Sequence, residues 1–220
     1  MHNSRFTAHT EVLKAQFASR SEAGRYAANQ RWNGHMNPAL ASRLQAGLAQ
    51  MRRSGGSVDF VSVGSTEDRM LIAGQRGMVM RTLAEVADRV SGDEVATERI
   101  RLVMQDVDGL FGQALTDRKN SLRVATLRLG DRVGAVALIH DTFGGPVVFD
   151  FLSTGLVDKA GSALFASIVE DATRQGKRTV GVYPDEGSEG FWRSMGFANL
   201  EHDELGNPTD KLELILGGAS

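Results

Sequence analysis

The sequence predicts an α/β fold in which helices flank a mixed β-sheet, with a helical extension at the N-terminus. Two observations predict the sheet. The β-rich runs 122–129 and 133–140 are joined by a tight turn at 130–132, which indicates an antiparallel hairpin. An apolar strand at 147–152 is followed by a helical stretch and a further strand at 179–183, and such a crossover places its two strands parallel.

A difference in charge separates the first 57 residues from the rest of the chain. Residues 1–57 contain eight basic and two acidic residues, whereas the whole chain has a net charge of -2. We therefore predict a basic helical extension at 1–57 and an α/β domain at 58–220. For residues 1–36, binding to nucleic acid or to another acidic partner is one of the alternatives that remain open.

The extension is predicted to contain two helices. Residues 11–32 form an Ala- and Arg-rich helical stretch that ends at the Asn-Gly pair 33–34, and the Asn-Pro pair 37–38 supplies the cap and first turn of the next helix. The second helix carries an apolar stripe at spacings i, i+4, i+8 and i+11, formed by Leu40, Leu44, Leu48 and Met51. The stripe predicts that residues 38–52 dock on the body of the protein or on a second subunit.

The composition excludes several classes of site. The chain has 220 residues, of which 41% are hydrophobic and 24% charged, and this is enough for one medium globular domain with a full core. The absence of cysteine excludes disulfides, thiolate catalysis and cysteine-based zinc sites. The five histidines lack metal-ligand spacing, so no metal is expected. Residues 1–10 are polar, and no run approaches the roughly 18 apolar residues of a membrane span, which predicts a soluble cytoplasmic protein.

The elements before the hairpin follow from local patterns. Residues 58–63 form a short β-rich strand, and residues 65–68 (Ser-Thr-Glu-Asp) match a capping box that begins a long helix. A break in this helix is predicted at Gly74 or Gly77. Residues 94–118 form a helix with an apolar face over four turns or more, so this helix is expected to lie on the sheet.

The elements after the crossover complete the sheet. A short helix is predicted around Phe191 and Trp192, and a last pair of strands at 197–202 and 211–216, separated by the turn residues 206–208. The order of elements from residue 58 onward is that of a mixed sheet with helices on both faces.

A candidate ligand site lies between the strand at 147–152 and the helix that follows. The strand stops at residues 153–155 (Ser-Thr-Gly), and the helix opens at residues 159–162 (Lys-Ala-Gly-Ser). A strand that ends in a small-residue loop before a helix directs free backbone N–H groups and the positive end of the helix dipole at one point, which suits a phosphate. The alternative is that Gly161 and Ser162 are small because the helix packs closely at its start.

The segment 191–197 (Phe-Trp-Arg-Ser-Met-Gly-Phe) and the order of elements over 58–216 resemble the GNAT superfamily of acyl-CoA-dependent N-acetyltransferases. The resemblance implies that acetyl-CoA, or another acyl-CoA, binds where the two parallel strands splay apart. The pantetheine then pairs with the backbone of the first strand, and the pyrophosphate is held by amides of the following loop. The implied cofactor-binding residues are Phe151, Leu152, Ser153, Lys159, Ala160, Gly161, Ser162 and Trp192.

The sequence departs from the pattern of this family in three places. Of the loop motif Arg/Gln-x-x-Gly-x-Gly/Ala, only Gly161 matches, because Leu156 and Lys159 occupy the other two positions. A residue other than glycine at 159 disfavours the positive φ that a nest of amides requires. The tyrosine that protonates the leaving thiolate in many members is replaced by Trp192, whose indole N–H is no general acid near neutral pH, and the frequent asparagine after the second strand is replaced by Asp185.

Two residues are candidates for catalysis under this resemblance. Asp150 lies on the strand in phase with Val148 and Leu152, so its carboxylate is a candidate base for the amine substrate; the alternative is a strand-end salt bridge. Tyr183 ends the next strand, and its phenol is a candidate for the missing acid; the alternative is a tyrosine that caps the core with a solvated hydroxyl.

Two functions therefore stay open from the sequence. The first is an acetyl-CoA-dependent N-acetyltransferase that acts on a primary amine of a small molecule or a protein. The second is a GNAT-like fold that has lost catalysis and serves as a binding or structural module, for instance in a phage particle or on nucleic acid. The changes at Leu156, Lys159 and Trp192 favour the second function, and the Gly161 turn favours the first.

Overall fold

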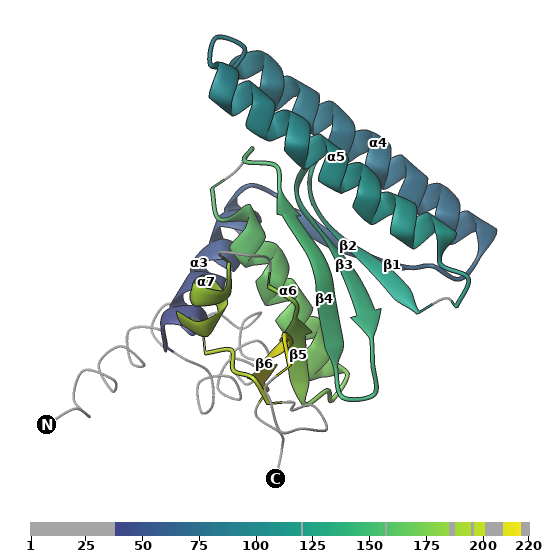
Figure 1. Ribbon diagram of the computed structural model, residues 1–220, viewed down its shortest axis with the longest axis vertical. Coiled ribbons are helices and arrows are strands. Elements are labelled where there is room, and N and C mark those ends of the chain that lie inside the picture. The colour runs from purple at the N-terminus through teal and green to yellow at the C-terminus, as the bar shows by residue number, and fades with distance from the viewer. Residues whose placement is uncertain are drawn as a thin grey trace, which may run out of the picture.

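The computed structural model describes residues 38–119, 121–156, 158–184, 188–194, 196–200 and 209–216. A six-stranded sheet forms the centre of this region, and helices cover both of its faces (Figure 1). In chain order the elements are α3 (Pro38–Arg53), β1 (Ser57–Ser62), α4 (Thr66–Arg89), α5 (Glu94–Thr116), β2 (Leu122–Leu129), β3 (Arg132–Asp141), β4 (Pro146–Ser153), α6 (Ala160–Arg174), β5 (Thr179–Val182), α7 (Glu189–Ser194) and β6 (Leu212–Ile215). The predicted α/β fold with a mixed sheet is confirmed.

The strands follow one another across the sheet in chain order, from β1 to β6. Neighbouring strands are antiparallel except β4 and β5, which are parallel, so the predicted hairpin and the predicted parallel crossover are both confirmed. The strand predicted at 197–202 is wrong over 197–200, where only Ala198 pairs, in an isolated bridge to Glu213. Since β6 has only four residues, it offers little edge for a longer ladder.

Helices α4 and α5 lie side by side across one face of the sheet (Figure 1). The predicted capping box is present: Asp68 N–H donates to Ser65 Oγ at 3.1 Å, and Ser65 N–H donates to the Asp68 carboxylate at 2.8 Å. The break predicted at Gly74 or Gly77 is wrong, because α4 runs through both residues. Each interior glycine costs about 1 kcal/mol relative to alanine, which is less than burying a single side chain such as Leu83 contributes.

The carboxylate of Asp117 stabilises the turn that follows α5. The Asp117 side chain accepts hydrogen bonds from the backbone N–H groups of Lys119, Ser121 and Leu122 at 2.9, 2.8 and 3.0 Å, and Arg69 of α4 donates to the Asp117 carbonyl at 2.7 Å. Desolvation raises the pKa of Asp117, but the backbone hydrogen bonds together outweigh it, so the pKa lies below its ordinary value. The ionised carboxylate therefore stabilises the entry into β2.

Helix α3 packs on α6 and belongs to the same core. Leu44 and Leu48 are buried in the cluster that contains the inner faces of α6, β5 and β6. A Cβ atom on Gly47 would lie 2.5 Å from the backbone nitrogen of Ala163, so only glycine permits this approach. The predicted docking of residues 38–52 is thus confirmed, on the body of the same chain.

Several predictions fall outside the described residues. They concern the helix at 11–32, the partners of residues 1–36 and the side chain of Leu40. The division of the chain at residue 57 stays a prediction as well. Within the part of the chain that the structure describes, no helix combines the length and the apolar character that a membrane span requires.

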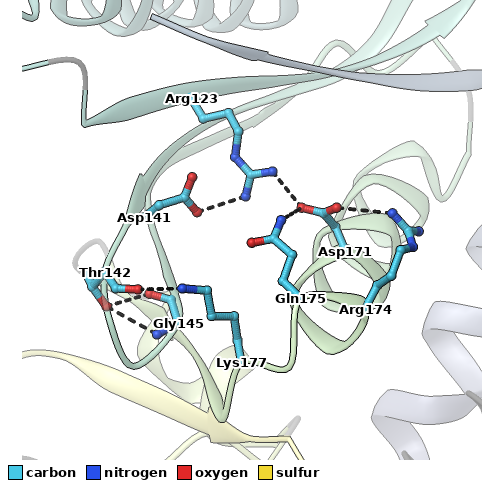
Figure 2. Close-up of polar contacts among 8 residues, drawn as sticks. All are labelled: Arg123, Asp141, Thr142, Gly145, Asp171, Arg174, Gln175 and Lys177. Atoms are coloured by element: carbon cyan, nitrogen blue, oxygen red, sulfur yellow. Dashed lines mark hydrogen bonds and ion pairs between the residues drawn. The ribbon is translucent and has the colours of Figure 1, made fainter. Parts of the chain in front are cut away.

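A buried ion-pair network holds the C-terminal end of α6 against the sheet (Figure 2). Arg123 of β2 is 7% exposed, and its guanidinium contacts Asp171 of α6 at 2.6 Å and Asp141 of β3 at 2.9 Å. Gln175 donates a further hydrogen bond to the Asp171 carboxylate at 2.8 Å. The Phe60 ring lies under the guanidinium at 5.0 Å, which adds a cation–π contact. This network fixes α6 and thereby the helix start that faces β4.

Candidate functional site

The parallel strands β4 and β5 pair over two residues and then part. Val147 is paired with Gly181 and Val148 with Val182, whereas β4 continues to Ser153. Beyond Val148, no described strand pairs with β4 on the β5 side. The backbone of this stretch of β4, which includes the predicted residues Phe151, Leu152 and Ser153, therefore offers hydrogen-bonding groups to a ligand.

A β-bulge at Phe149 lies where the strands part. Leu138 of β3 is paired with Asp150 and Ile139 with Val148, so Phe149 is an extra residue on β4. The extra residue reverses the sides of the sheet to which the following side chains of β4 point. Val148 belongs to the core on the α6 side, whereas Leu152 packs against the core on the α5 side. Asp150 lines a groove on that same α5 side. The predicted phase of Asp150 is therefore correct relative to Leu152 and wrong relative to Val148.

An uncharged cleft of about 160 Å³ with several aromatic walls occupies the space between the parted strands. Its walls are formed by β4, the end of β5 and α7, and none of the lining side chains is charged; the residues are Val148, Phe149, Phe151, Val182, Tyr183, Ser188 and Trp192. Phe149 and Tyr183 stack with ring centroids 5.4 Å apart and remain 42% and 45% exposed. The cleft thus brings together Phe151, Tyr183 and Trp192 of the predicted site residues.

Trp192 connects this cleft to the core. Its half-buried ring makes edge contacts with Phe151, Phe165 and Phe197 at centroid distances of 6.4, 5.5 and 5.3 Å. Edge-to-face aromatic contacts of this kind are each worth about 0.5–1.5 kcal/mol beyond the buried area. Trp192 therefore has a packing role at the position where the family that the sequence resembles carries an acidic phenol.

The start of α6 presents an uncapped helix N-terminus beside the cleft. The first helical bond runs from the Ala163 N–H to the Lys159 carbonyl at 2.9 Å, and no side chain among the described residues caps the amides of Ala160, Gly161 and Ser162 that precede it. Lys159 adopts φ 63° and ψ 13° and is the one non-glycine residue with positive φ in the described part of the chain. A lysine disfavours this conformation, as expected, but the surrounding fold holds it there, and the backbone is strained as a result.

Gly161 has a packing reason to be glycine. A Cβ atom there would lie 3.2 Å from Cε1 of Phe151, so the helix start and the edge of β4 approach closely. The helix start thus lies close to Phe151, which lines the cleft, although no residue of the helix start is among the lining residues of the cleft. Close packing is therefore present at Gly161, and anion binding by its amide stays a prediction.

A second, more polar groove lies on the opposite side of β4, against α5. It has a volume of about 390 Å³ and is lined by Gln105, Asp106, Gly109, Leu110 and Gln113 of α5 and by Asp150, Phe151 and Leu152 of β4. Phe151 lines both the cleft and the groove, so the two meet at this residue. The sequence offered no signal for the α5 residues, because they look like the solvated face of an amphipathic helix. Asp185 lies outside the described residues.

Comparisons with known proteins bear on the fold. No protein-family model matches the sequence, and no curated protein does either. In fold the chain is similar to GNAT acetyltransferases. A putative GNAT acetyltransferase from Desulfovibrio desulfuricans is 16% identical, with a TM-score of 0.38, over 74% of this chain and 100% of that one.

Two further solved structures are similar to this chain. Tetrahymena GCN5 is 14% identical, with a TM-score of 0.45, over 74% of this chain and 98% of that one. The PaiA N-acetyltransferase from Thermoplasma acidophilum, solved in complex with coenzyme A, is 14% identical, with a TM-score of 0.40, over 72% and 99% of the two chains. The likeness concerns the fold alone.

Proposed function

We propose that the protein is an acyl-CoA-dependent N-acyltransferase that transfers an acetyl group from acetyl-CoA to a primary amine. The observation that carries the proposal is the separation of β4 from β5 after Val148 and Val182, which leaves an uncharged cleft whose residue Phe151 lies close to the start of α6. The order of the elements and the parting of β4 from β5 support the proposal, because the resemblance of the sequence to the GNAT superfamily implies both.

The residues of the site fit the chemical parts of acyl-CoA. The uncharged, aromatic cleft suits the acyl and pantetheine portion, and the backbone of β4 from Phe151 to Ser153 offers the peptide-like partners that pantetheine amides require. The amides of Ala160, Gly161 and Ser162, together with the helix dipole, suit the pyrophosphate. The exposed ammonium of Lys159 adds a positive charge at the same helix start.

The proposed reaction requires one proton to move from the amine to the departing sulfur. The amine nitrogen bonds to the acyl carbon, the carbon–sulfur bond breaks, and the amine loses the proton that the thiolate finally gains. Asp150 faces the groove on the α5 side and is the proposed base. The Tyr183 phenol lines the cleft and is the proposed acid, since Trp192 cannot supply the proton.

A catalytically inactive binding module is the second candidate function. The observation that favours it is the integration of Trp192 into the aromatic core at the place of the usual acid. A module of this kind retains the cleft and its ligand but does not transfer the acyl group.

Thermal unfolding with and without acetyl-CoA, followed by an acetyl-transfer assay, separates these functions. A ligand at 100 times its dissociation constant stabilises the fold by about 2.7 kcal/mol. At about 2–4 °C per kcal/mol for a chain of this size, the unfolding midpoint rises by about 5–10 °C. A shift with transfer supports the enzyme, a shift without transfer supports the inactive module, and no shift at millimolar acetyl-CoA contradicts both.

The Tyr183→Phe variant tests the proposed acid. It keeps the ring that stacks on Phe149 and removes only the hydroxyl. We expect an unchanged acetyl-CoA shift and a transfer rate lowered by about 10²-fold or more, the size of a general-acid contribution. An unchanged rate excludes Tyr183 as the acid.

A further inference from the structure

The rings of Phe149 and Tyr183 form a stacked pair where β4 and β5 part. Their centroids are 5.4 Å apart, the interplanar angle is 23°, and both residues line the cleft. We propose that Phe149 is a positioning residue, whose ring holds the Tyr183 phenol in the cleft for proton transfer. The proposal rests on the proposed function, because Tyr183 is the proposed acid of that reaction.

Tyr183 needs a neighbour that limits the movement of its side chain. It is the first residue after β5, and the ladders of β5 to β4 and β6 both end at Val182. Its side chain is exposed, and within the described part of the chain Phe149 is the one aromatic ring that stacks on it. A general acid must lie about 2.6–3.2 Å from the atom that it protonates, so a phenol free to change rotamer would rarely be in place.

The β-bulge makes Phe149 available for this contact. Phe149 is the extra residue of β4 and has no partner in the ladder to β3. Its ring contacts His140 of β3, with centroids 5.8 Å apart, as well as Tyr183. The Phe149 ring therefore connects β3 to the residue that follows β5, across the strand that carries it. Bulges next to functional sites re-aim side chains in this way.

Phe149 contributes little to the core, which separates a positioning role from a structural one. Its side chain is exposed, and it belongs to neither of the two hydrophobic clusters on the faces of the sheet. A stacked aromatic pair changes the population of a rotamer by about two- to tenfold. Loss of the Phe149 ring should therefore leave the fold intact and lower the fraction of molecules in which the Tyr183 phenol is in place.

A double-mutant cycle tests whether Phe149 acts through the Tyr183 hydroxyl. Acetyl transfer is measured with whichever of n-butylamine, benzylamine and Nα-acetyl-lysine reacts fastest, and a thiol reagent detects the released coenzyme A, since the chain has no cysteine. Phe149→Leu should lower kcat about fivefold, without a comparable change in the KM for acetyl-CoA. In the Tyr183→Phe background the same substitution should have no effect, because the hydroxyl that it misplaces is already absent.

Two further variants separate the ring of Phe149 from its bulk. Phe149→Trp restores an aromatic face without adding an acid and should therefore recover most of the kcat that Phe149→Leu loses. Phe143→Leu is the matched control, because Phe143 is a fully exposed phenylalanine that does not line the cleft. Equal losses of kcat in both backgrounds, or a change confined to the KM for acetyl-CoA, overturn the positioning role while the acyltransferase function stands.

NMR of ring-labelled tyrosine gives a readout that does not require catalysis. The chain has two tyrosines, Tyr26 and Tyr183, so Tyr183→Phe identifies their signals. Phe149→Leu should move the Tyr183 signals, because it removes the ring current of the stacked neighbour, and Phe143→Leu should not. Tyr183 signals that stay in place in Phe149→Leu overturn the positioning role alone. A stack confirmed by NMR in a protein that acetylates none of the amines shows that the proposed function has failed, and the positioning role fails with it.

Discussion

The strained conformation of Lys159 gives a prediction in which two variants separate backbone strain from charge. Lys159 has φ 63°, a conformation that costs a residue with a side chain about 1–2 kcal/mol. Glycine removes this cost but gives the unfolded chain more freedom, which opposes the gain by about 0.4–1 kcal/mol. Lys159→Gly should therefore raise the free energy of unfolding by about 0.5–1 kcal/mol, or the unfolding midpoint by about 2 °C in a chain of this size.

Urea unfolding followed by circular dichroism measures this difference, with Lys159→Ala as the control. Alanine removes the ammonium group and keeps the strain, so its stability should stay within about 0.5 kcal/mol of the natural protein, as for other surface substitutions. If the ammonium assists pyrophosphate binding, both variants lose the same factor in affinity for acetyl-CoA. A Lys159→Gly protein that is less stable than Lys159→Ala would refute the strained helix start.

Three further predictions concern the packing and the charges that position the site. Gly47→Ala should destabilise the protein by about 2 kcal/mol in urea unfolding, because the new methyl group meets the α6 backbone. In the control Gly74→Ala the methyl group meets no neighbouring atom, so this variant should be more stable by about 0.5–1 kcal/mol. Equal effects of the two substitutions would contradict the close approach of α3 to α6. Asp171→Ala should lower the free energy of unfolding by about 3 kcal/mol. This is the lower end of the range for a broken buried ion pair, because Asp141 still contacts Arg123. A decrease of less than about 1 kcal/mol would show that the network contributes little to stability. The pKa of Asp117 is lowered in the folded protein, so its contribution is fully present above the pKa of about 3.9 of an unfolded aspartate and is lost as the pH falls through the lower folded value. Acid unfolding of Asp117→Asn should therefore depend less on pH below about 4 than that of the natural protein, and identical pH profiles would exclude this role.

The elements that the sequence predicted correctly are those with a local cause. The capping box at Ser65 and Asp68 is formed by groups three residues apart, and the turn at 130–132 brings β2 and β3 together without help from the rest of the chain. The parallel pairing of β4 and β5 follows from the length and handedness of the crossover. In the first two cases the residues that decide the structure are near one another in the sequence, and in the third a single connecting helix decides the direction of the second strand.

The features that escaped prediction depend on contacts between distant segments. The bulge at Phe149 shifts the register of β4 relative to β3. No residue type in this strand indicates a bulge, so the predicted phase of Asp150 relative to Val148 was wrong. Lys159 holds a positive φ because the start of α6 is fixed by β4 and α3. The groove residues on α5 are polar and exposed, and such residues have the same pattern whether they face a groove or open water.

Occupation of the cleft between β4 and β5 by acyl-CoA is tested most directly by a crystal structure of the protein grown with coenzyme A. The expected result places the pantetheine along β4 beyond Val148, its sulfur in the cleft beside Phe151 and Tyr183, and the pyrophosphate at the amides of Gly161 and Ser162. Coenzyme A bound elsewhere on the molecule, or an empty cleft at a saturating concentration, would contradict the proposed acyltransferase site.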